Sequence, residues 1–195
     1  MNKCSTKQRL AIFASGAGSN AMQLITHFST HTTISIELVV CNKPDAGVVN
    51  IAKQYNIDVL MIDKKKFDAD GYLKEILAKG INFIVLAGFL WKIPEILIKD
   101  FKKKIVNIHP ALLPKYGGKG MYGQQVHNSV IEAGEKESGI TIHWVDGQYD
   151  HGKVIFQVSC PVLKDDTATT LSKRIHTLEH QYYPLIVEKV LMQKK

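Results

Sequence analysis

The side chains of Asn107 and His109 have the types and the spacing of a catalytic pair. They stand two residues apart at the end of Lys104 to Ile108, an apolar run with the composition of a buried strand. On an extended backbone, residues two apart point to the same side. Pro110 then ends regular pairing because it has no N–H group to donate. An amide beside an imidazole can stabilise an oxyanion and move a proton, although such a pair can also simply cap a strand.

Three motifs, in order along the chain, resemble those of the folate-dependent formyltransferases. The segment from Asn107 to Pro114 resembles the family signature, and Asp150, followed by His151 and Gly152, matches the third catalytic position. The loop from Ala14 to Asn20 is similar to that of members that act in purine synthesis. The resemblance implies that 10-formyltetrahydrofolate is the co-substrate and that 5'-phosphoribosylglycinamide is the acceptor. It also implies three catalytic residues, which are Asn107, His109 and Asp150.

The glycine loop has two interpretations from its spacing. Gly16, Gly18 and Ala21 fit the dinucleotide-binding pattern GxGxxG/A, which also requires an acidic residue at the end of the second strand. The second strand ends at Cys41 without that acid, so a cradle for a monophosphate is the better interpretation. A turn that serves only the topology is the alternative. The resemblance assigns the substrate phosphate to Ala17, Gly18, Ser19 and Asn20.

Two further parts of the chain are assigned to the substrates by the resemblance alone. Glu179 stands where the family contacts the ribose hydroxyls, and a plain polar helix residue is the alternative. Residues 146–150 correspond to the loop that wraps the pterin ring, mainly through backbone groups. The implied folate-binding residues are Leu90, Trp91, Lys92, Ile93, Asn107, Asp146 and Asp150. Packing in the core is the alternative for Leu90 and Ile93.

The chain departs from the family pattern at three places. Trp91 stands where the family often has arginine, and residues 117–123 replace a stretch that often carries histidine. His151 replaces a glycine after the catalytic carboxylate, which is retained. These departures leave open how Trp91 meets the folate and what His151 does.

The resemblance also implies direct transfer of the formyl group. The substrate amine attacks the formyl carbon, and negative charge develops on the formyl oxygen. Asn107 is expected to donate to that oxygen, and His109, kept protonated by Asp150, to donate as well and then to protonate the leaving folate nitrogen. The chain has no Gly-x-Ser-x-Gly elbow and no activated-cysteine motif, so a covalent acyl-enzyme is not expected.

Alternating strands and helices predict an α/β fold with a doubly wound, mostly parallel twisted sheet. An antiparallel C-terminal portion and a long C-terminal helix complete the expected fold, in a single domain of residues 1–195. The predicted strands are 9–14, 34–41, 58–62, 81–87, 104–108, 139–144 and 153–162. The predicted helices are 21–28, 45–55, 67–79, 94–99, 124–133 and a last one capped at 166–167 and ending near 190. Its predicted inner stripe is Leu171, Ile175, Leu178, Tyr182, Leu185 and Ile186, with a kink at Pro184.

The composition limits the partners. A net charge of +7 favours an anionic partner such as a phosphate ester or a polyglutamate tail. No nucleic acid is expected because no basic stripe is interleaved with aromatic residues, and no membrane is expected because no apolar run approaches the about 20 residues of a span. Cys4, Cys41 and Cys160 lack metal-ligand spacing and indicate reduced thiols in a cytoplasmic protein without a metal. A monomer and a homodimer are both compatible with the sequence.

Two other classes of function compete with this interpretation. The first is a formyltransferase that acts on another phosphorylated amine, a sugar amine or methionyl-tRNA. The tRNA enzymes usually carry an extra C-terminal domain, which is not expected here. The second is a phosphate- or nucleotide-binding module without catalysis, which the glycine loop and the positive charge would suit. The presence of Asn107, His109 and Asp150 in the family order argues against the second class.

Overall fold

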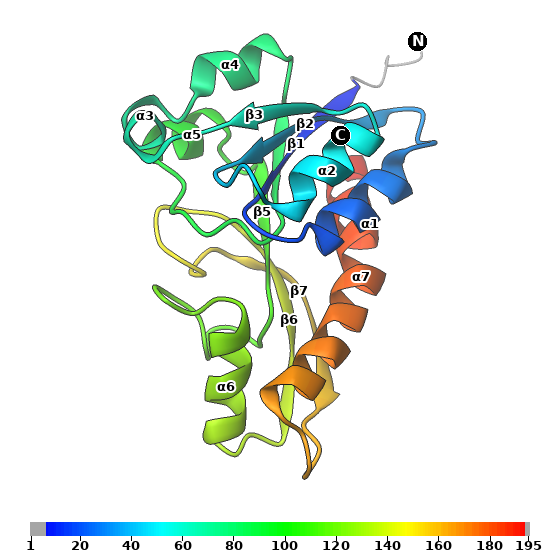
Figure 1. Ribbon diagram of the computed structural model, residues 1–195, viewed down its shortest axis with the longest axis vertical. Helices are drawn as coiled ribbons and strands as arrows, with labels where there is room; N and C mark the ends of the chain where they lie inside the picture. Colours follow the sequence, from blue (N-terminus) through cyan, green and yellow to red (C-terminus); the bar gives the residue numbers. More distant parts are fainter. Residues whose placement is uncertain (1–6, 194–195) are drawn as a thin grey trace. The chain divides into compact units, whose positions relative to one another are not determined.

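The computed structural model of the chain describes residues 7–193, so Cys4 lies outside the described residues. The chain divides into two compact units, Met1–Ile105 and Val106–Lys195 (Figure 1). The strands have the hydrogen-bonded order β3-β2-β1-β4-β5-β6-β7. This order, with parallel pairing early in the chain and antiparallel pairing late in it, confirms the predicted fold class. Among the described residues, no helix is both long enough and apolar enough to span a membrane.

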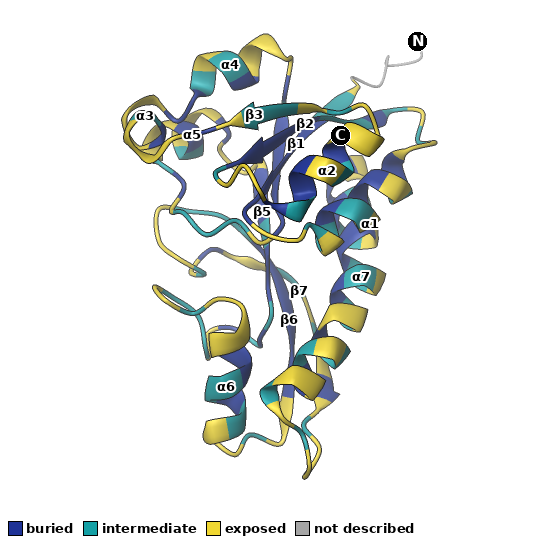
Figure 2. Ribbon diagram, in the orientation of Figure 1, coloured by how far each residue is buried: buried dark blue, intermediate teal, exposed yellow. Residues whose placement is uncertain are grey.

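The first unit contains the parallel part of the sheet. β1 pairs in parallel with β2 and with β4, and β2 pairs in parallel with β3. The whole of β4 and residues 10–14 of β1 are buried, as expected of strands that are covered on both faces (Figure 2). The elements are β1 (Gln8–Ala14), α1 (Ser19–Phe28), β2 (Ile34–Cys41), α2 (Gly47–Gln54), β3 (Asp58–Met61), α3 (Lys64–Asp70), α4 (Leu73–Ala78), β4 (Phe83–Leu86) and α5 (Glu95–Asp100).

The prediction of one helix at 67–79 is wrong, because the segment forms α3 and α4. Gly71 and Tyr72, between them, have φ angles of 62° and 53°. Two successive residues in the left-handed region interrupt the helical hydrogen-bond ladder. A Cβ at Gly71 would lie 2.8 Å from Cγ of Leu97, so both the conformation and the packing against α5 favour glycine there.

The second unit contains the antiparallel part of the sheet. β5 (Ile105–His109), which begins at the boundary, pairs with β6 (Glu137–Trp144), and β6 pairs with β7 (Val154–Pro161). α6 (Gln124–Glu132) packs beside α7 (Ala168–Met192), and α7 lies along β6 and β7 (Figure 1). The hydroxyl of the fully buried Tyr183 donates to the carbonyl of Val106 at 3.5 Å, which joins α7 to β5.

α7 begins at the predicted N-cap and continues through Pro184. The Thr167 hydroxyl accepts from the backbone N–H of Thr170 at 3.2 Å, and the Thr170 hydroxyl accepts from the backbone N–H of Thr167 at 2.9 Å. This reciprocal pair is a capping box, which satisfies N–H groups that the first turn leaves without an intrahelical acceptor.

The predicted inner stripe of α7 is only partly right. Leu171 and Ile175 are buried, but Leu185 is 51 % exposed and wrongly included. Leu178, Tyr182 and Ile186 are half-buried. The buried positions beyond Ile175 are Glu179, Tyr183, Pro184, Val187, Val190 and Leu191. The prediction followed apolar residues alone, whereas the helix turns a carboxylate inward at Glu179.

Asp166 stabilises the start of α7 and generates a first prediction. Its carboxylate, only 4 % exposed, accepts from the backbone N–H of Leu163 at 2.7 Å, the hydroxyl of Thr170 at 2.7 Å and the guanidinium of Arg174 at 2.6 Å. The bond from Arg174 in particular holds the pKa of Asp166 well below its usual value. The stabilisation is therefore present above the unfolded pKa of about 3.9 and is lost as the pH falls toward the folded pKa.

We expect Asp166→Asn to lower the free energy of unfolding by about 1–3 kcal/mol at pH 7, because hydrogen bonds to a charged group are lost. The difference from wild type should shrink below about pH 3.9, where the unfolded carboxyl is protonated. Urea denaturation at both pH values measures this difference. Asp165→Asn is the matched control because Asp165 is exposed. Equal destabilisation by both substitutions would contradict the assignment.

Candidate active site

The second unit brings the three predicted catalytic residues together around one carboxylate. Asn107 and His109 lie on β5, and Asp150 lies in the loop between β6 and β7. One Asp150 oxygen, Oδ1, lies 3.4 Å from Nδ2 of Asn107, and the other, Oδ2, lies 3.5 Å from Nδ1 of His109. The prediction that Asn107 and His109 point to the same side is therefore confirmed.

Asp150 is buried and charged. Its side chain is 10 % exposed, and Oδ2 accepts the backbone N–H of Gly118 at 3.0 Å. Burial acts to raise the pKa of Asp150, but its interactions with His143, His109 and Gly118 together lower it. The backbone of Asp150 has a φ of 53°, in the left-handed region that costs free energy for a residue with a side chain. This conformation of Asp150 places its carboxylate beside the side chains of β5.

His109 differs from the expectation that Asp150 keeps it protonated. Its side chain is 4 % exposed, and burial lowers the pKa of His109 by more than Asp150 raises it. Nε2 of His109 lies 2.7 Å from the carbonyl oxygen of Tyr116. A carbonyl can only accept, so Nε2 carries a proton, and Nδ1 faces Asp150. When the ring is neutral, Nδ1 therefore presents a lone pair.

His143 belongs to the cluster but was not predicted as a site residue. Its Nδ1 lies 2.9 Å from the carbonyl oxygen of Trp144 and therefore carries the proton, which leaves Nε2 as an acceptor. The amide nitrogen of Asn107 lies 3.1 Å from that Nε2 and donates to it. This bond orients the Asn107 amide with its N–H groups toward His143 and Asp150. His143 is paired with Asn107 across β5 and β6, and only that register, which no local motif reveals, could have pointed to it.

The loop expected to wrap the pterin ring is held by side chains of its own. Oδ2 of Asp146 lies 2.9 Å from Nδ1 of His151, and Oδ1 accepts the backbone N–H of Gln148 at 2.8 Å. Burial acts to raise the pKa of Asp146, but these bonds lower it overall. His151, whose role the sequence left open, therefore pairs with Asp146 inside the loop.

Glu179 is 4 % exposed and is not a surface residue of its helix. Its carboxylate lies 2.8 Å from Nδ1 of His176, and this bond raises the pKa of His176. Its charge also acts on His109 and on the buried His127, whose pKa values it tends to raise. Glu179 therefore contributes negative charge to the interior of the second unit, near His109 and His127.

In the first unit, the predicted phosphate loop and the predicted folate loop meet at Ser15. The backbone N–H of Ser15 donates to the carbonyl of Gly88 at 3.1 Å, and the Ser15 hydroxyl accepts the backbone N–H of Leu90 at 3.1 Å. Gly18 is the N-cap of α1 with a φ of 85°, and a Cβ there would lie 2.8 Å from Cα of Val48. Both the conformation and the close approach of Val48 therefore favour glycine at the start of α1.

The residues of the predicted folate segment 90–93 differ in how far they are buried and in what they contact. Ile93 is 4 % exposed, in agreement with the alternative of core packing, and Lys92 is exposed. Trp91 packs on an aromatic cluster, with its ring centroid 5.8 Å from that of Phe67 and 6.2 Å from that of Phe89. The ammonium of Lys64 lies 5.5 Å from the Trp91 ring, a distance suited to a cation–π interaction.

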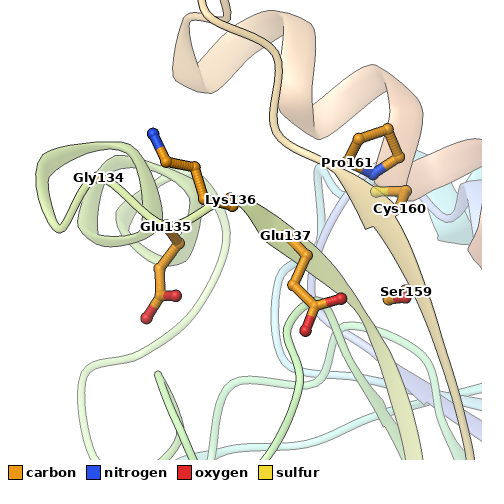
Figure 3. A pocket seen from close by; sticks show the side chains of 7 residues that line it. All are labelled: Gly134, Glu135, Lys136, Glu137, Ser159, Cys160 and Pro161. Atoms are coloured by element: carbon orange, nitrogen blue, oxygen red, sulfur yellow. The ribbon is translucent and has the colours of Figure 1, made fainter.

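A hollow elsewhere in the second unit contains none of the predicted site residues. It has a volume of about 580 Å³ and lies where the turn after α6 approaches the end of β7 (Figure 3). Its lining residues are Gly134, Glu135, Lys136, Glu137, Ser159, Cys160 and Pro161. Within residues 7–193, no three His, Cys, Asp or Glu side chains are arranged to hold a metal ion.

Comparison with known proteins identifies the family to which this fold and cluster belong. The model of the formyl transferase family matches residues 8–187, so the chain belongs to that family. The proteins to which it is similar include several phosphoribosylglycinamide formyltransferases. The chloroplastic protein of Arabidopsis thaliana is 40 % identical, and the match covers 96 % of this chain and 67 % of the plant protein.

Relatives from bacteria match over nearly their whole length. The phosphoribosylglycinamide formyltransferase of Bacillus subtilis is 33 % identical, over 94 % of this chain and 95 % of its own. The crystal structure of the phosphoribosylglycinamide formyltransferase from Bacillus halodurans has a TM-score of 0.88 and 32 % identity, over 96 % of this chain and 97 % of that one. These similarities confirm the predicted resemblance.

The carboxylate of Asp150 is the strongest of the interactions that raise the pKa of His109. We expect Asp150→Asn to lower the pKa of His109 further, because burial then opposes the imidazolium with less compensation. An NMR titration of the His109 ring in the free protein measures this shift. Asp146→Asn is the control because Asp146 pairs with His151. A His109 pKa that stays unchanged in Asp150→Asn would contradict the electrostatic account.

Proposed function

We propose that this chain transfers the formyl group of 10-formyltetrahydrofolate to the amine of 5'-phosphoribosylglycinamide, a reaction of purine synthesis. Membership of the formyl transferase family and the similarity to phosphoribosylglycinamide formyltransferases support this reaction. The observation that carries it is the convergence of Asn107 and His109 on the buried carboxylate of Asp150. A phosphate-binding module without catalysis has no need of a buried carboxylate that faces an imidazole and an amide.

The chemistry requires one bond to form, one to break and one proton to move. The amine nitrogen of phosphoribosylglycinamide bonds to the formyl carbon, and the bond from that carbon to the folate nitrogen breaks. The amine loses a proton, and the folate nitrogen gains one. Between these steps the formyl oxygen carries negative charge, which a positioned N–H donor stabilises.

The roles of the side chains follow from their hydrogen bonds. Asn107 supplies N–H groups that already point into the cluster, and one of them turns from Asp150 or His143 to the formyl oxygen. His109 is neutral in the free protein, so its Nδ1 can take the proton from the amine and return it to the folate nitrogen. Asp150 stabilises the imidazolium formed between these transfers.

The binding residues form the remainder of the proposal. Ala17, Gly18, Ser19 and Asn20 bind the phosphate, and Glu179 binds the ribose hydroxyls. Leu90, Trp91, Lys92 and Ile93 bind the folate, together with Asn107, Asp146 and Asp150. The first turn of α1 supports the phosphate assignment, because its N–H groups lack intrahelical acceptors and carry the positive end of the helix dipole.

Both units act together as one formyltransferase domain in this proposal, because a single family model spans residues 8–187. The partners are small molecules, and the protein works as a monomer or a homodimer in the cytoplasm. The sparse cysteines support a reducing compartment, since Cys41 and Cys160 are both free thiols.

Turnover by the purified protein tests the reaction. We expect folate release when 10-formyltetrahydrofolate is mixed with phosphoribosylglycinamide, and far less with glycinamide, which lacks the ribose phosphate. Absorbance of the folate product follows the reaction. Transfer to glycinamide at the same efficiency would contradict the phosphate site at residues 17–20. The absence of transfer to either amine, in folded protein, would contradict the proposed function.

Substitutions test the catalytic roles. Loss of one oxyanion donor typically slows an enzyme by roughly 100- to 1,000-fold, so we expect Asn107→Ala to reduce kcat by about that factor. His109→Ala should lose at least as much, because it removes the proton carrier. His27→Ala, which alters a histidine at the far end of α1 from Ser19, is the control. Wild-type turnover by His109→Ala would exclude His109 as the proton carrier.

A further inference from the structure

One short segment of the second unit holds both members of the proposed proton-transfer pair. The carbonyl of Tyr116 accepts Nε2–H of His109 at 2.7 Å, and the N–H of Gly118 donates to Oδ2 of Asp150 at 3.0 Å. Both contacts are made by backbone groups, so they cannot be predicted from the types of residues 116 and 118. The positions of His109 and Asp150 therefore depend on the path of residues 116–118.

That path includes an unfavourable conformation. Tyr116 has a φ of 56°, which is uncommon for an aromatic residue. Such a conformation persists only where surrounding contacts hold it. A cavity of about 250 Å³ adjoins Tyr116. The lining residues are Leu112, Leu113, Pro114, Lys115, Tyr116, Val130, Glu135, Glu137 and Ser138. The Tyr116 side chain therefore has room to shift.

The contact that opposes such a shift is made by Glu135. The hydroxyl of Tyr116 donates to Oε1 of Glu135 at 2.9 Å, and the ammonium of Lys115 donates to the same oxygen at 2.8 Å. These bonds lower the pKa of Glu135, so it is a carboxylate that accepts both. Glu135 follows α6, and its backbone N–H bonds to the carbonyl of Val130 at 3.3 Å, which ties it to that helix. Figure 3 shows Glu135 and Glu137 as separate side chains at this turn.

We propose that Glu135 is a positioning residue for the reaction: through the hydroxyl of Tyr116 it holds the carbonyl that binds Nε2–H of His109, and so directs Nδ1 of His109 toward Asp150. The inference rests on the proposed function, in which His109 carries the proton. Glu135 touches neither His109 nor Asp150 in any described contact, and it acts only through the backbone of Tyr116.

The contact with the Tyr116 carbonyl determines which tautomer the neutral His109 ring adopts. A neutral imidazole carries one proton, and a carbonyl at Nε2 requires that proton to be there. Nδ1 then has the free lone pair that can accept a proton from an amine. Without the carbonyl, the proton can move to Nδ1 and donate to Asp150, and the ring presents no lone pair on that side. The other titratable groups that act on His109 are Asp150, His143, Glu179 and His127. None of them has a described contact with Glu135, and Asp150 is bound to the same segment through the N–H of Gly118.

The chain of contacts from Glu135 through Tyr116 to His109, called the tether below, can be tested in the free protein without substrates. Nitrogen NMR of the His109 ring is the measurement. The signal is assigned by its loss in His109→Gln. We expect wild type to show the tautomer with the proton on Nε2. Tyr116→Phe, which removes only the hydroxyl, should show a mixture of both tautomers, and so should Glu135→Gln, which removes the charge. Glu137→Gln makes the same chemical change two residues on, at the same cavity, and should resemble wild type.

Kinetics provide a second measurement on the same variants. Tyr116→Phe should lower kcat by about tenfold, since small displacements of a catalytic group are costly, while KM for both substrates changes less than about twofold. The carbonyl contact raises the pKa of His109, so the limb of the pH profile that belongs to His109 should move to lower pH in this variant. Glu137→Gln should keep both the rate and the profile.

The outcomes separate the tether from the proposed function. Wild-type tautomer and pH profile in both Tyr116→Phe and Glu135→Gln would overturn the inference, even if the melting temperature falls, because a merely structural contact changes stability alone. If Glu135→Gln does not fold, the tautomer and pH profile of Tyr116→Phe alone test the inference. If wild type shows no formyl transfer, the proposed function fails, and mixed tautomers in Tyr116→Phe would still establish the tether.

Discussion

A carboxylate that is removed from water must be compensated by donors around it, and the second unit is arranged to compensate Asp150. Its oxygens accept from the amide of Asn107 and from the backbone N–H of Gly118, and the rings of His109 and His143 lie 3.5 Å and 3.6 Å from them. These groups come from β5, from the segment that follows β5 and from β6. Because these groups meet at one carboxylate, the three parts of the chain share one geometry in the free protein.

Backbone carbonyls assign the protons in this cluster. The carbonyl of Tyr116 places the His109 proton on Nε2, whereas the carbonyl of Trp144 places the His143 proton on Nδ1. The two imidazoles therefore have opposite tautomers although they lie against the same carboxylate. In the proposed reaction, His109 accepts a proton and His143 orients the Asn107 amide, so the main-chain carbonyls determine which ring nitrogen is available.

The sequence was sufficient for the fold, because strand-end motifs and periodicity are local signals. Its motifs also pointed to Asn107, His109 and Asp150, which the structure brings together. The sequence was insufficient to predict features that depend on contacts between residues far apart in the chain. The break at Gly71 and Tyr72 depends on packing against α5, and the burial of Glu179 depends on the interior of the second unit. The expected protonation of His109 considered its charged neighbour but not its burial, which has the larger effect on its pKa.

The antiparallel pairing of β5 with β6 has a consequence for how this chain can vary. Asn107 stands opposite His143, and their relation depends on strand register, not on the length of the segment that joins the two strands. Residues 110–118 are constrained because they supply contacts to His109 and Asp150. Residues 119–123 bear no such contact in the described structure. A change in the length of that short glycine-containing stretch would therefore leave the pairing of Asn107 with His143 intact.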